Sequence, residues 1–464
     1  MKLRHLLFGF LFIMPLFSYS EGSNEIWVDQ PGHRTSLHLC SDLVSHCNQF
    51  GGGDDRSNFA VYGCDSLDRL YFYINDPNEV VYLGFNGTQA HPPFTSADWH
   101  VVFRIRHIGG AVVYPETEAP SVLGAGFIAD IANARVGPNQ IAGAGGYDAF
   151  EFTPGAVGEY YLEFQRVDNN TGNYEADEFF MELFDVTVYD TVASEIRTGR
   201  LYSRAWQFWD ERAQGFNFQN HSSTFYAYSI DSIITSLTYD QMEGRAWSMY
   251  CNQFGVQQSG NFIIDRMSVE NLQAHVPEYP IFLNPPDTLV FPPATVPGSI
   301  TDTITCTSFC DGTKIFRVVV DKPGSVEIIL DFDPPYVTTS LQVIVSTGEN
   351  FIPWDGLDGV GAPVNNNTNI DFTVSYINGL TNLPLYDIEV NPNGFSIGLY
   401  APTGATPLVF WDDTNISGGG TNLTGCNSEP PNPGCHQWPF NDFGDHNTIN
   451  TLSLIHISEP TRLC

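Results

Sequence analysis

Groups of aspartate and asparagine on predicted turns are the residues of this chain best suited to bind a metal ion. Carboxylate and amide oxygens clustered on a turn are ligands that suit a hard cation such as Ca²⁺. Three such stretches occur, and each is a candidate calcium site. Their candidate ligands are Asp331, Asp333, Asp355, Asp358, Asp168, Asn170 and Asp177.

A structural role is the favoured alternative for the stretch that begins at Trp354. Asp355 and Asp358 would accept hydrogen bonds from turn amides, while Trp354 would anchor a core. Three glycines in the same stretch would supply positive φ angles. These glycines are Gly356, Gly359 and Gly361.

Aromatic side chains offer a second binding chemistry, because sugar rings stack on exposed aromatic faces. The candidates for such stacking are Trp99, Trp206 and Trp209, together with several tyrosines. Core packing is the favoured interpretation for most of them, since large aromatic residues are usually buried.

Catalytic motifs are weak. The chain has no His-Glu-x-x-His and no phosphate-binding loop. Glu151 and Glu163 could serve a glycosidase, which needs two carboxyl groups. With 53 acidic residues in the chain, however, solvated surface acids are the favoured interpretation. We therefore expect no enzyme within this sequence.

The elements that position these residues are predicted to be strands. Helical periodicity is nearly absent, and apolar or alternating runs are separated by Gly, Asn, Asp and Pro. The clearest runs are 70–74, 80–85, 100–105, 160–166, 179–189 and 225–234, and one helical turn is expected within 128–135. The sequence therefore predicts an all-β protein made of tandem β-sandwiches.

The strand runs divide into three expected domains. Residues 22–190 are predicted to form a jelly-roll-like sandwich, 191–298 a second sandwich and 299–412 an immunoglobulin-like sandwich. The Pro-rich stretch 285–297 is expected to be a linker or an edge segment. Residues 413–451 are expected to be an incomplete loop region that holds a disulfide.

The N-terminus of the chain carries a processing signal. Lys2, Arg4 and His5 precede an apolar run over 6–17, and Ser18 and Ser20 occupy the −3 and −1 positions of a cleavage site. This pattern predicts a signal peptide at 1–20 and hence export. No later apolar run approaches the ~18 residues of a membrane span.

Residues 452–462 resemble the in-frame translation of a sequencing adapter. We therefore expect 452–464 to be non-native and to pack poorly, and the natural frame to continue beyond about residue 451. Cys464 is then left out of the cysteine count.

Eight of the nine cysteines remain, and an exported chain favours disulfides over zinc. Cys426 and Cys435 flank a Pro-rich loop and are expected to pair locally. Cys306 and Cys310 are close enough to pair but would form a tight ring. The other four cysteines could pair in three ways, and the sequence does not distinguish among them. The four are Cys40, Cys47, Cys64 and Cys251.

The net charge of −34 restricts the partners. After the predicted signal peptide the only lysines are Lys314 and Lys322, and the acidic residues far outnumber the basic ones, which argues against nucleic acid and anionic membranes as partners because both bind through neutralising cations. Glycans or cell-surface molecules are the expected partners, and Ca²⁺ is the one expected cofactor.

The most specific motif is Pro353-Trp-Asp-Gly-Leu-Asp-Gly-Val-Gly-Ala-Pro-Val364. It resembles the immunoglobulin-like hairpin of flagellar-hook-cap-like and gliding-motility-associated sorting domains. With Gly434-Cys-His-Gln-Trp438, the region 190–450 is similar to large secreted surface proteins of Bacteroidota that end in gliding-motility-associated C-terminal domains and leave by the type IX system. The resemblance implies a non-enzymatic extracellular surface or adhesion protein. The alternative is a carbohydrate-binding ancillary region of an extracellular polysaccharide-degrading enzyme.

Overall fold

The computed structural model describes residues 20–26, 33–40, 58–87, 98–175, 178–212, 219–244, 246–271, 275–309, 313–404, 406–427, 434–438, 443–458 and 462–463. Within these residues the chain is mainly strand, which confirms the predicted all-β class, and the paired strands named below all run antiparallel. The helices in this part of the chain are short. They are α1 (Ser23–Ile26), α2 (Ile131–Val136), α3 (Asn139–Ala142) and α4 (Phe262–Asp265), and none is long and apolar enough to cross a membrane.

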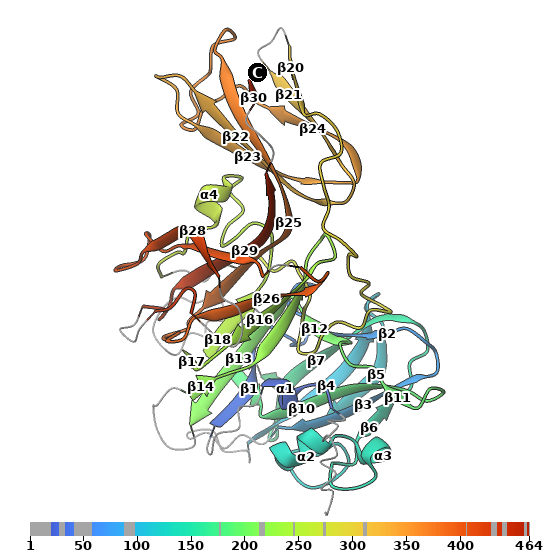
Figure 1. Cartoon of the computed structure of the whole chain (residues 1–464). Coiled ribbons are helices and arrows are strands. Elements are labelled where there is room, and N and C mark those ends of the chain that lie inside the picture. The colour runs from blue at the N-terminus through green and yellow to red at the C-terminus, as the bar shows by residue number, and fades with distance from the viewer. Residues whose placement is uncertain are drawn as a thin grey trace, which may run out of the picture.

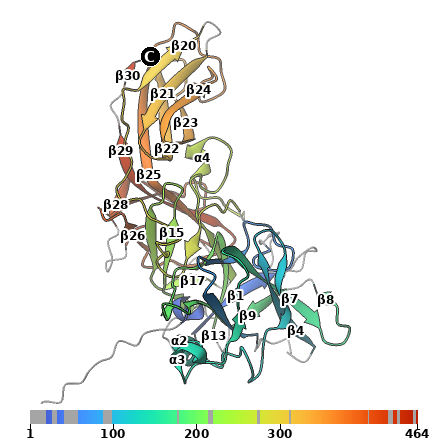
Figure 2. The ribbon, with the colours of Figure 1, turned by 90° about the vertical axis from the view of Figure 1, so that its right-hand side faces the viewer.

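The molecule is elongated and consists of two bodies stacked end to end (Figures 1 and 2). The upper body has its own hydrophobic core, which runs from Ile304 to Tyr376 and includes Phe316 and Trp354. The lower body contains the N-terminal half of the described chain and most of the residues after 376. Its largest core includes Phe72, Trp206 and Phe225.

The largest sheet belongs to both bodies. Its main path is β28 (Thr421–Asn427), β27 (Leu408–Asp412), β29 (Thr448–Ser458), β25 (Ile370–Tyr386), β18 (Ala246–Tyr250), β13 (Ala205–Arg212), β1 (His33–Cys40) and β9 (Glu178–Met181). Three strands join it in the upper body, namely β22 (Gly324–Phe332), β23 (Thr339–Val345) and β30 (Arg462–Leu463).

A second large sheet lies in the lower body. Its order is β26 (Phe395–Ala401), β16 (Ile234–Tyr239), β15 (Thr224–Tyr228), β19 (Ile281–Phe282), β12 (Leu201–Ser203), β2 (Leu70–Ile74), β7 (Gly158–Asp168), β4 (Trp99–His107) and β5 (Val112–Glu118), and β8 (Tyr174–Glu175) pairs with β7. Alternate side chains of its strands enter the same core as those of the largest sheet, because successive residues of a strand point to opposite faces.

Three smaller sheets complete the described structure. The lower body holds β11 (Glu195–Ile196), β10 (Leu183–Asp190), β3 (Glu79–Asn86) and β6 (Phe150–Phe152), and the pair β14 (Gln219–His221) and β17 (Met242–Gly244). The upper body holds β20 (Thr305–Ser308), β21 (Lys314–Val320) and β24 (Gly348–Trp354).

Strand pairing crosses the boundary that was expected near residue 190. Strand β12 pairs with β2, and β13 pairs with β1, so segments on either side of that boundary share sheets and a core. The boundary expected at 412 is crossed as well, because β26 and β27 belong to the lower body rather than to the upper one. Local strand patterns do not encode these pairings, which depend on long-range packing.

The segment after residue 451 is well packed where the structure describes it, contrary to our expectation. Strand β29 runs through Ser458 and pairs with β25 from Tyr386 to Ser375 with one irregularity. Leu452 and Ser453 are buried. Alternating apolar residues allow this segment to complete a sheet, whatever the origin of its sequence.

Candidate functional site

The predicted turn chemistry of the Trp354 stretch is confirmed. Asp358 Oδ1 accepts hydrogen bonds from the amides of Val360 and Ala362 at 3.1 and 2.8 Å, and Asp355 Oδ1 accepts one from Leu357 at 3.0 Å. Trp354 lies in the upper core, as expected. Although partial desolvation opposes the shift, the amide donors hold the pKa of Asp358 below its ordinary value.

The glycines of this stretch do not all act as expected. Gly356 and Gly361 have φ angles of 82° and 78°, as a turn requires. Gly359 has no positive φ, but a Cβ there would lie 2.2 Å from the backbone oxygen of Thr338. Close backbone approach, rather than a left-handed conformation, therefore requires glycine at 359.

The other candidate calcium ligands lie on separate loops. Asp331 accepts a hydrogen bond from the Thr338 hydroxyl, and Asp168 accepts two from the amides of Asn170 and Thr171 at 2.6 and 2.9 Å. The side chains of Asp333 and Asn170 are exposed, and Asp177 lies outside the described residues. In the described part of the chain, one group of side chains has its ligand atoms close enough together to hold a metal ion. None of these candidate residues belongs to that group.

That group consists of Asp387, Asp445 and His446, whose ligand atoms lie within 4.8 Å of one another. Asp387 follows β25, and the other two residues precede β29, so the pairing of these two strands brings the group together. A hydrogen bond from the backbone holds His446 beside Asp387, because the His446 amide donates to Asp387 Oδ1 at 3.4 Å. Asp387 and His446 both adopt positive φ angles, of 62° and 58°.

Glu389 adds a buried carboxyl beside this group. Burial, followed by the charges of Asp387 and Asp445, raises the pKa of Glu389 to about 9. Its Oε2 atom is buried without a hydrogen-bond partner. An imidazole with several carboxylates suits a transition metal better than Ca²⁺. The adjacent Asp445 and His446 are two potential metal ligands that could have been recognised in the sequence. Asp387 is distant from them in the sequence, and only the fold brings it close.

The three tryptophans proposed for sugar stacking are in the wrong place for that role. Trp99, Trp206 and Trp209 are only 4%, 0% and 4% exposed. The indole N–H of Trp206 donates to the Ile281 oxygen at 3.0 Å, and the Trp209 ring packs 4.6 Å from Phe180. These rings therefore fill the protein interior, which is the alternative that the sequence favoured.

An aromatic pocket of about 280 Å³ lies on the outer side of the second large sheet. Tyr202, Tyr228 and Phe291 line it, and the Phe291 ring lies 5.5 Å from Tyr202 and 5.7 Å from Tyr228. Phe291 belongs to the Pro-rich stretch that was expected to be a linker or edge. This stretch packs against the sheet instead, because Phe291 also contacts Phe282 at 4.8 Å.

Charged side chains border the same pocket. Glu159 accepts a hydrogen bond from the Tyr202 hydroxyl, and Glu278 accepts one from Gln253 Nε2 at 2.6 Å. Burial raises the pKa of Glu278. Arg204 lies over the neighbouring Tyr71 ring at 5.3 Å. Aromatic faces beside a few fixed polar groups are typical of a small-ligand site.

The two glutamates considered for glycosidase chemistry occupy different sheets. Glu151 is exposed on β6, whereas Glu163 is buried on β7. Arg104 Nη2 and Arg106 Nε contact the Glu163 carboxylate at 2.6 and 2.8 Å. This double ion pair gives Glu163 a structural role.

The expected Cys426–Cys435 disulfide is present, with a Cα–Cα distance of 6.1 Å. Cys306 is also disulfide-bonded, while its expected partner Cys310 lies outside the described residues. The prediction for Cys64 and Cys251 is wrong, because both are free buried thiols in the lower core.

Burial in this core raises the pKa of both free thiols and favours their neutral, apolar form. Of the other two expected partners, Cys40 is the last residue of β1 and Cys47 lies outside the described residues.

Comparison of the chain with protein-family models, with curated proteins and with solved structures gives no match.

Proposed function

We propose that this chain is a non-enzymatic extracellular surface or adhesion protein and part of a larger type IX-secreted protein. The observation that carries the proposal is the seventeen-residue strand β25, which pairs with β22 in the upper body and with β18 in the lower one. A continuous strand fixes two bodies relative to each other, unlike a Gly/Ser-rich linker. Such an extended, stiff unit suits a protein that holds a binding surface away from a cell. In this proposal the upper body is immunoglobulin-like and the lower body jelly-roll-like.

Charge and cross-linking support an extracellular setting. The net charge of −34 favours solubility outside the cell, and the Cys426–Cys435 disulfide suits an oxidising compartment. Adhesion is tested by deleting the gene and measuring attachment of the cells to glycan-coated and cell-coated surfaces. The proposal predicts reduced attachment that the intact gene restores. Unchanged attachment on every surface would count against an adhesive role.

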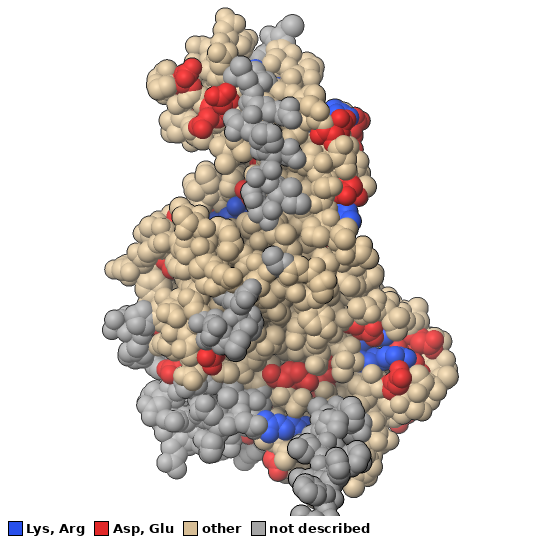
Figure 3. Space-filling model, viewed as in Figure 1, with Lys and Arg blue, Asp and Glu red and all other residues tan. Residues whose placement is uncertain are grey.

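Carbohydrate binding is the second candidate function, and the pocket at Tyr228 and Phe291 favours it. Tyr202, which is 0% exposed, packs against Phe291 and offers no face to a sugar. The pocket has the size and aromatic lining that suit a sugar ring. On the face shown in Figure 3, charged side chains form small separate groups within a largely uncharged surface. The charged residues that line the pocket are Glu159, Glu278 and Arg204.

Two substitutions at one position test this pocket on a glycan array. Tyr228→Ala removes the ring and is expected to abolish glycan binding. Tyr228→Phe keeps the ring and loses only the hydroxyl, which donates to the Pro292 oxygen at 2.9 Å, so it should retain binding. Tyr174→Ala removes an exposed tyrosine that does not line the pocket and serves as a control. Equal binding by all four proteins would remove the pocket from consideration.

A further inference from the structure

The residues that follow the predicted signal peptide are buried in the lower body. Glu21 and Ser23 are each 0% exposed. The Glu21 oxygen accepts a hydrogen bond from the Val186 amide at 2.9 Å, and Ser23 Oγ accepts one from the Phe184 amide at 2.9 Å. Helix α1 contacts β1 and β10, so this segment is an integral part of the interior.

Three carboxyl groups meet around this segment. Glu21 Oε1 accepts a hydrogen bond from the Gly199 amide at 2.8 Å, and Glu25 Oε2 accepts one from the Gly22 amide at 2.6 Å. The third is Asp185 on β10, which is fully buried. Its Oδ1 accepts a hydrogen bond from the backbone nitrogen of Glu21 at 3.0 Å.

Neutral donors complete the surroundings of Asp185. The Thr187 hydroxyl donates to Oδ1 at 2.6 Å, and the Tyr147 hydroxyl donates to Oδ2 at 2.6 Å. Burial raises the pKa of Asp185 to about 7 and that of Glu21 to about 8, because a buried carboxylate without a cation is costly. Glu25, which is partly buried, is shifted in the same direction.

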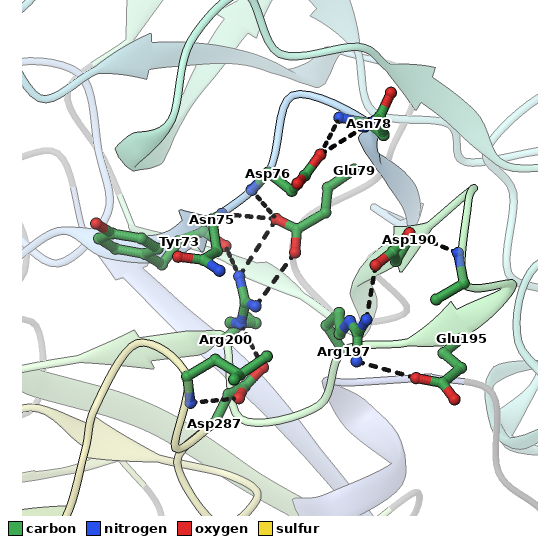
Figure 4. A network of polar contacts seen from close by, with 12 residues as sticks. Tyr73, Asn75, Asp76, Asn78, Glu79, Asp190, Glu195, Arg197, Arg200 and Asp287 are labelled. Atoms are coloured by element: carbon green, nitrogen blue, oxygen red, sulfur yellow. Dashed lines mark hydrogen bonds and ion pairs between the residues drawn. The ribbon is translucent and has the colours of Figure 1, made fainter.

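The adjacent arginine does not supply the missing charge. The Arg200 amide donates to Glu21 Oε2 at 3.3 Å, but its guanidinium group is bound elsewhere. Figure 4 shows that group between Glu79 and Asp287, with contacts of 3.2 and 2.8 Å. Within the described part of the chain, no lysine or arginine forms an ion pair with Glu21, Glu25 or Asp185.

We propose that cleavage between Ser20 and Glu21 creates an α-ammonium group that forms a buried ion pair with Asp185 and stabilises the mature fold. The proposal rests on the export that is part of the proposed function. In the cleavage step, signal peptidase adds water across the Ser20–Glu21 amide bond. The Ser20 carbonyl becomes a carboxylate, and the Glu21 nitrogen is released as an ammonium group.

The ammonium group needs no new space to reach its partner. The nitrogen already lies at hydrogen-bond distance from Asp185, and cleavage changes its charge from zero to +1. Ser20 is 3% exposed, so the peptidase can reach this bond only before the lower body folds. Cleavage therefore precedes the burial that the new charge stabilises.

Amine labelling of a chain that begins at Glu21 tests the ion pair. After the signal peptide the chain has two lysines, Lys314 and Lys322, so its amines are few and separable by mass spectrometry. A free α-amine has a pKa near 8 and reacts faster than lysine at pH 7.5. We expect the reverse order in the folded protein, with Lys322 labelled at least about tenfold faster than the α-amine. An α-amine that is labelled as fast in the folded as in the unfolded protein would overturn the proposal.

A double-mutant cycle of melting temperatures distinguishes stabilisation by the ion pair from the effect of burying the N-terminus. One extra glycine before Glu21 converts the ammonium group into an amide and is expected to lower the melting temperature by several degrees. Asp185→Asn should abolish most of this difference, whereas Thr187→Val, which removes only a neutral donor, should preserve it. An equal cost of the extra glycine in the wild-type and Asp185→Asn backgrounds would refute the ion pair. The chains used in these experiments are produced with a defined N-terminus, so the result does not depend on export. Failure of export would be seen separately, as retention of residues 1–20 in cells.

Discussion

The backbone nitrogen of Glu21 lies 3.0 Å from Oδ1 of Asp185, and both residues are fully buried. This contact joins the start of the described chain to a strand 164 residues later. It connects the predicted export signal to the stability of the lower body, because the charge on that nitrogen depends on processing.

The first prediction concerns the pH dependence of stability when residue 21 has an amide nitrogen. The pKa values of Asp185 and Glu21 are raised to about 7 and about 8 from ordinary values of 3.8 and 4.5. A raised carboxyl pKa gives stability that is fully present below the ordinary pKa and is lost as pH rises through the folded value. A chain that begins with an extra glycine should therefore lose stability between about pH 4 and pH 8.

Urea unfolding from pH 4 to pH 9 measures this effect. The chain that begins at Glu21 should show a shallower loss, and the gap between the two chains at pH 8 should be on the order of 2 kcal/mol. Parallel curves for the two chains would contradict the account.

The second prediction concerns Glu389, whose pKa is raised to about 9 by burial and by the neighbouring Asp387 and Asp445. The stability that the protonated Glu389 carboxyl contributes is likewise lost as pH rises toward 9, because the folded protein must then bury a carboxylate. Glu389→Gln removes this titration and should raise the free energy of unfolding at pH 8 to 9 by about 1 to 3 kcal/mol. Asp355→Asn, a change on an exposed turn of the upper body, is the control. If Glu389→Gln is less stable than wild type at both pH 5 and pH 9, the buried charge does not limit stability there.

The third prediction concerns cation binding at Asp387, Asp445 and His446. If this group binds a metal ion, Zn²⁺ or Mn²⁺ added after chelation should raise the melting temperature, and His446→Ala should remove most of that rise. Calorimetry with Ca²⁺ tests the calcium expectation for the Asp331, Asp168 and Asp355 loops. Absence of heat and of any thermal shift with all three ions would exclude both.

The fourth prediction concerns the thiols. Cys64 and Cys251 should resist a thiol reagent in the folded protein, because both are buried and have raised pKa values. In denaturant without reductant both should react fully. Peptide mapping should find the Cys426–Cys435 disulfide intact, and Cys426→Ser is the control that frees Cys435. A disulfide-linked peptide that contains Cys64 or Cys251 would contradict the structure.

The fifth prediction concerns the separate cores of the two bodies. Phe316→Ala removes a fully buried ring from the upper core and should cost about 3 to 5 kcal/mol there. Phe225→Ala is the matched change in the lower core. Hydrogen exchange should show faster opening of β21 and β22 in the first variant and of β15 and β16 in the second. Equal acceleration throughout the chain in both variants would show that the bodies unfold as one unit.

Features that depend on neighbouring residues were predictable from the sequence. The run 70–74 coincides with β2, the Asp355 and Asp358 turn bonds are confirmed, and the Cys426–Cys435 disulfide joins residues nine positions apart. Each of these follows from alternation, turn chemistry or a short loop.

Features that depend on distant segments were not predictable. The pairing of β1 with β13 and the group at Asp387, Asp445 and His446 both require the fold. Trp206 is buried against the second large sheet and Trp209 against Phe180 and Ala246 of neighbouring strands, and the local sequence specifies neither set of neighbours. The Glu21–Asp185 contact belongs to the same class, although the cleavage site beside it was visible in the sequence.

The most direct test of the central claim is proteolytic shaving of intact cells that express the gene, followed by mass spectrometry of the released and the intracellular peptides. The account predicts that peptides from both bodies are released from intact cells and that the most N-terminal peptide begins at Glu21. Recovery of the protein only from inside the cells, with the residues before Glu21 retained, would contradict the proposal of an exported surface protein.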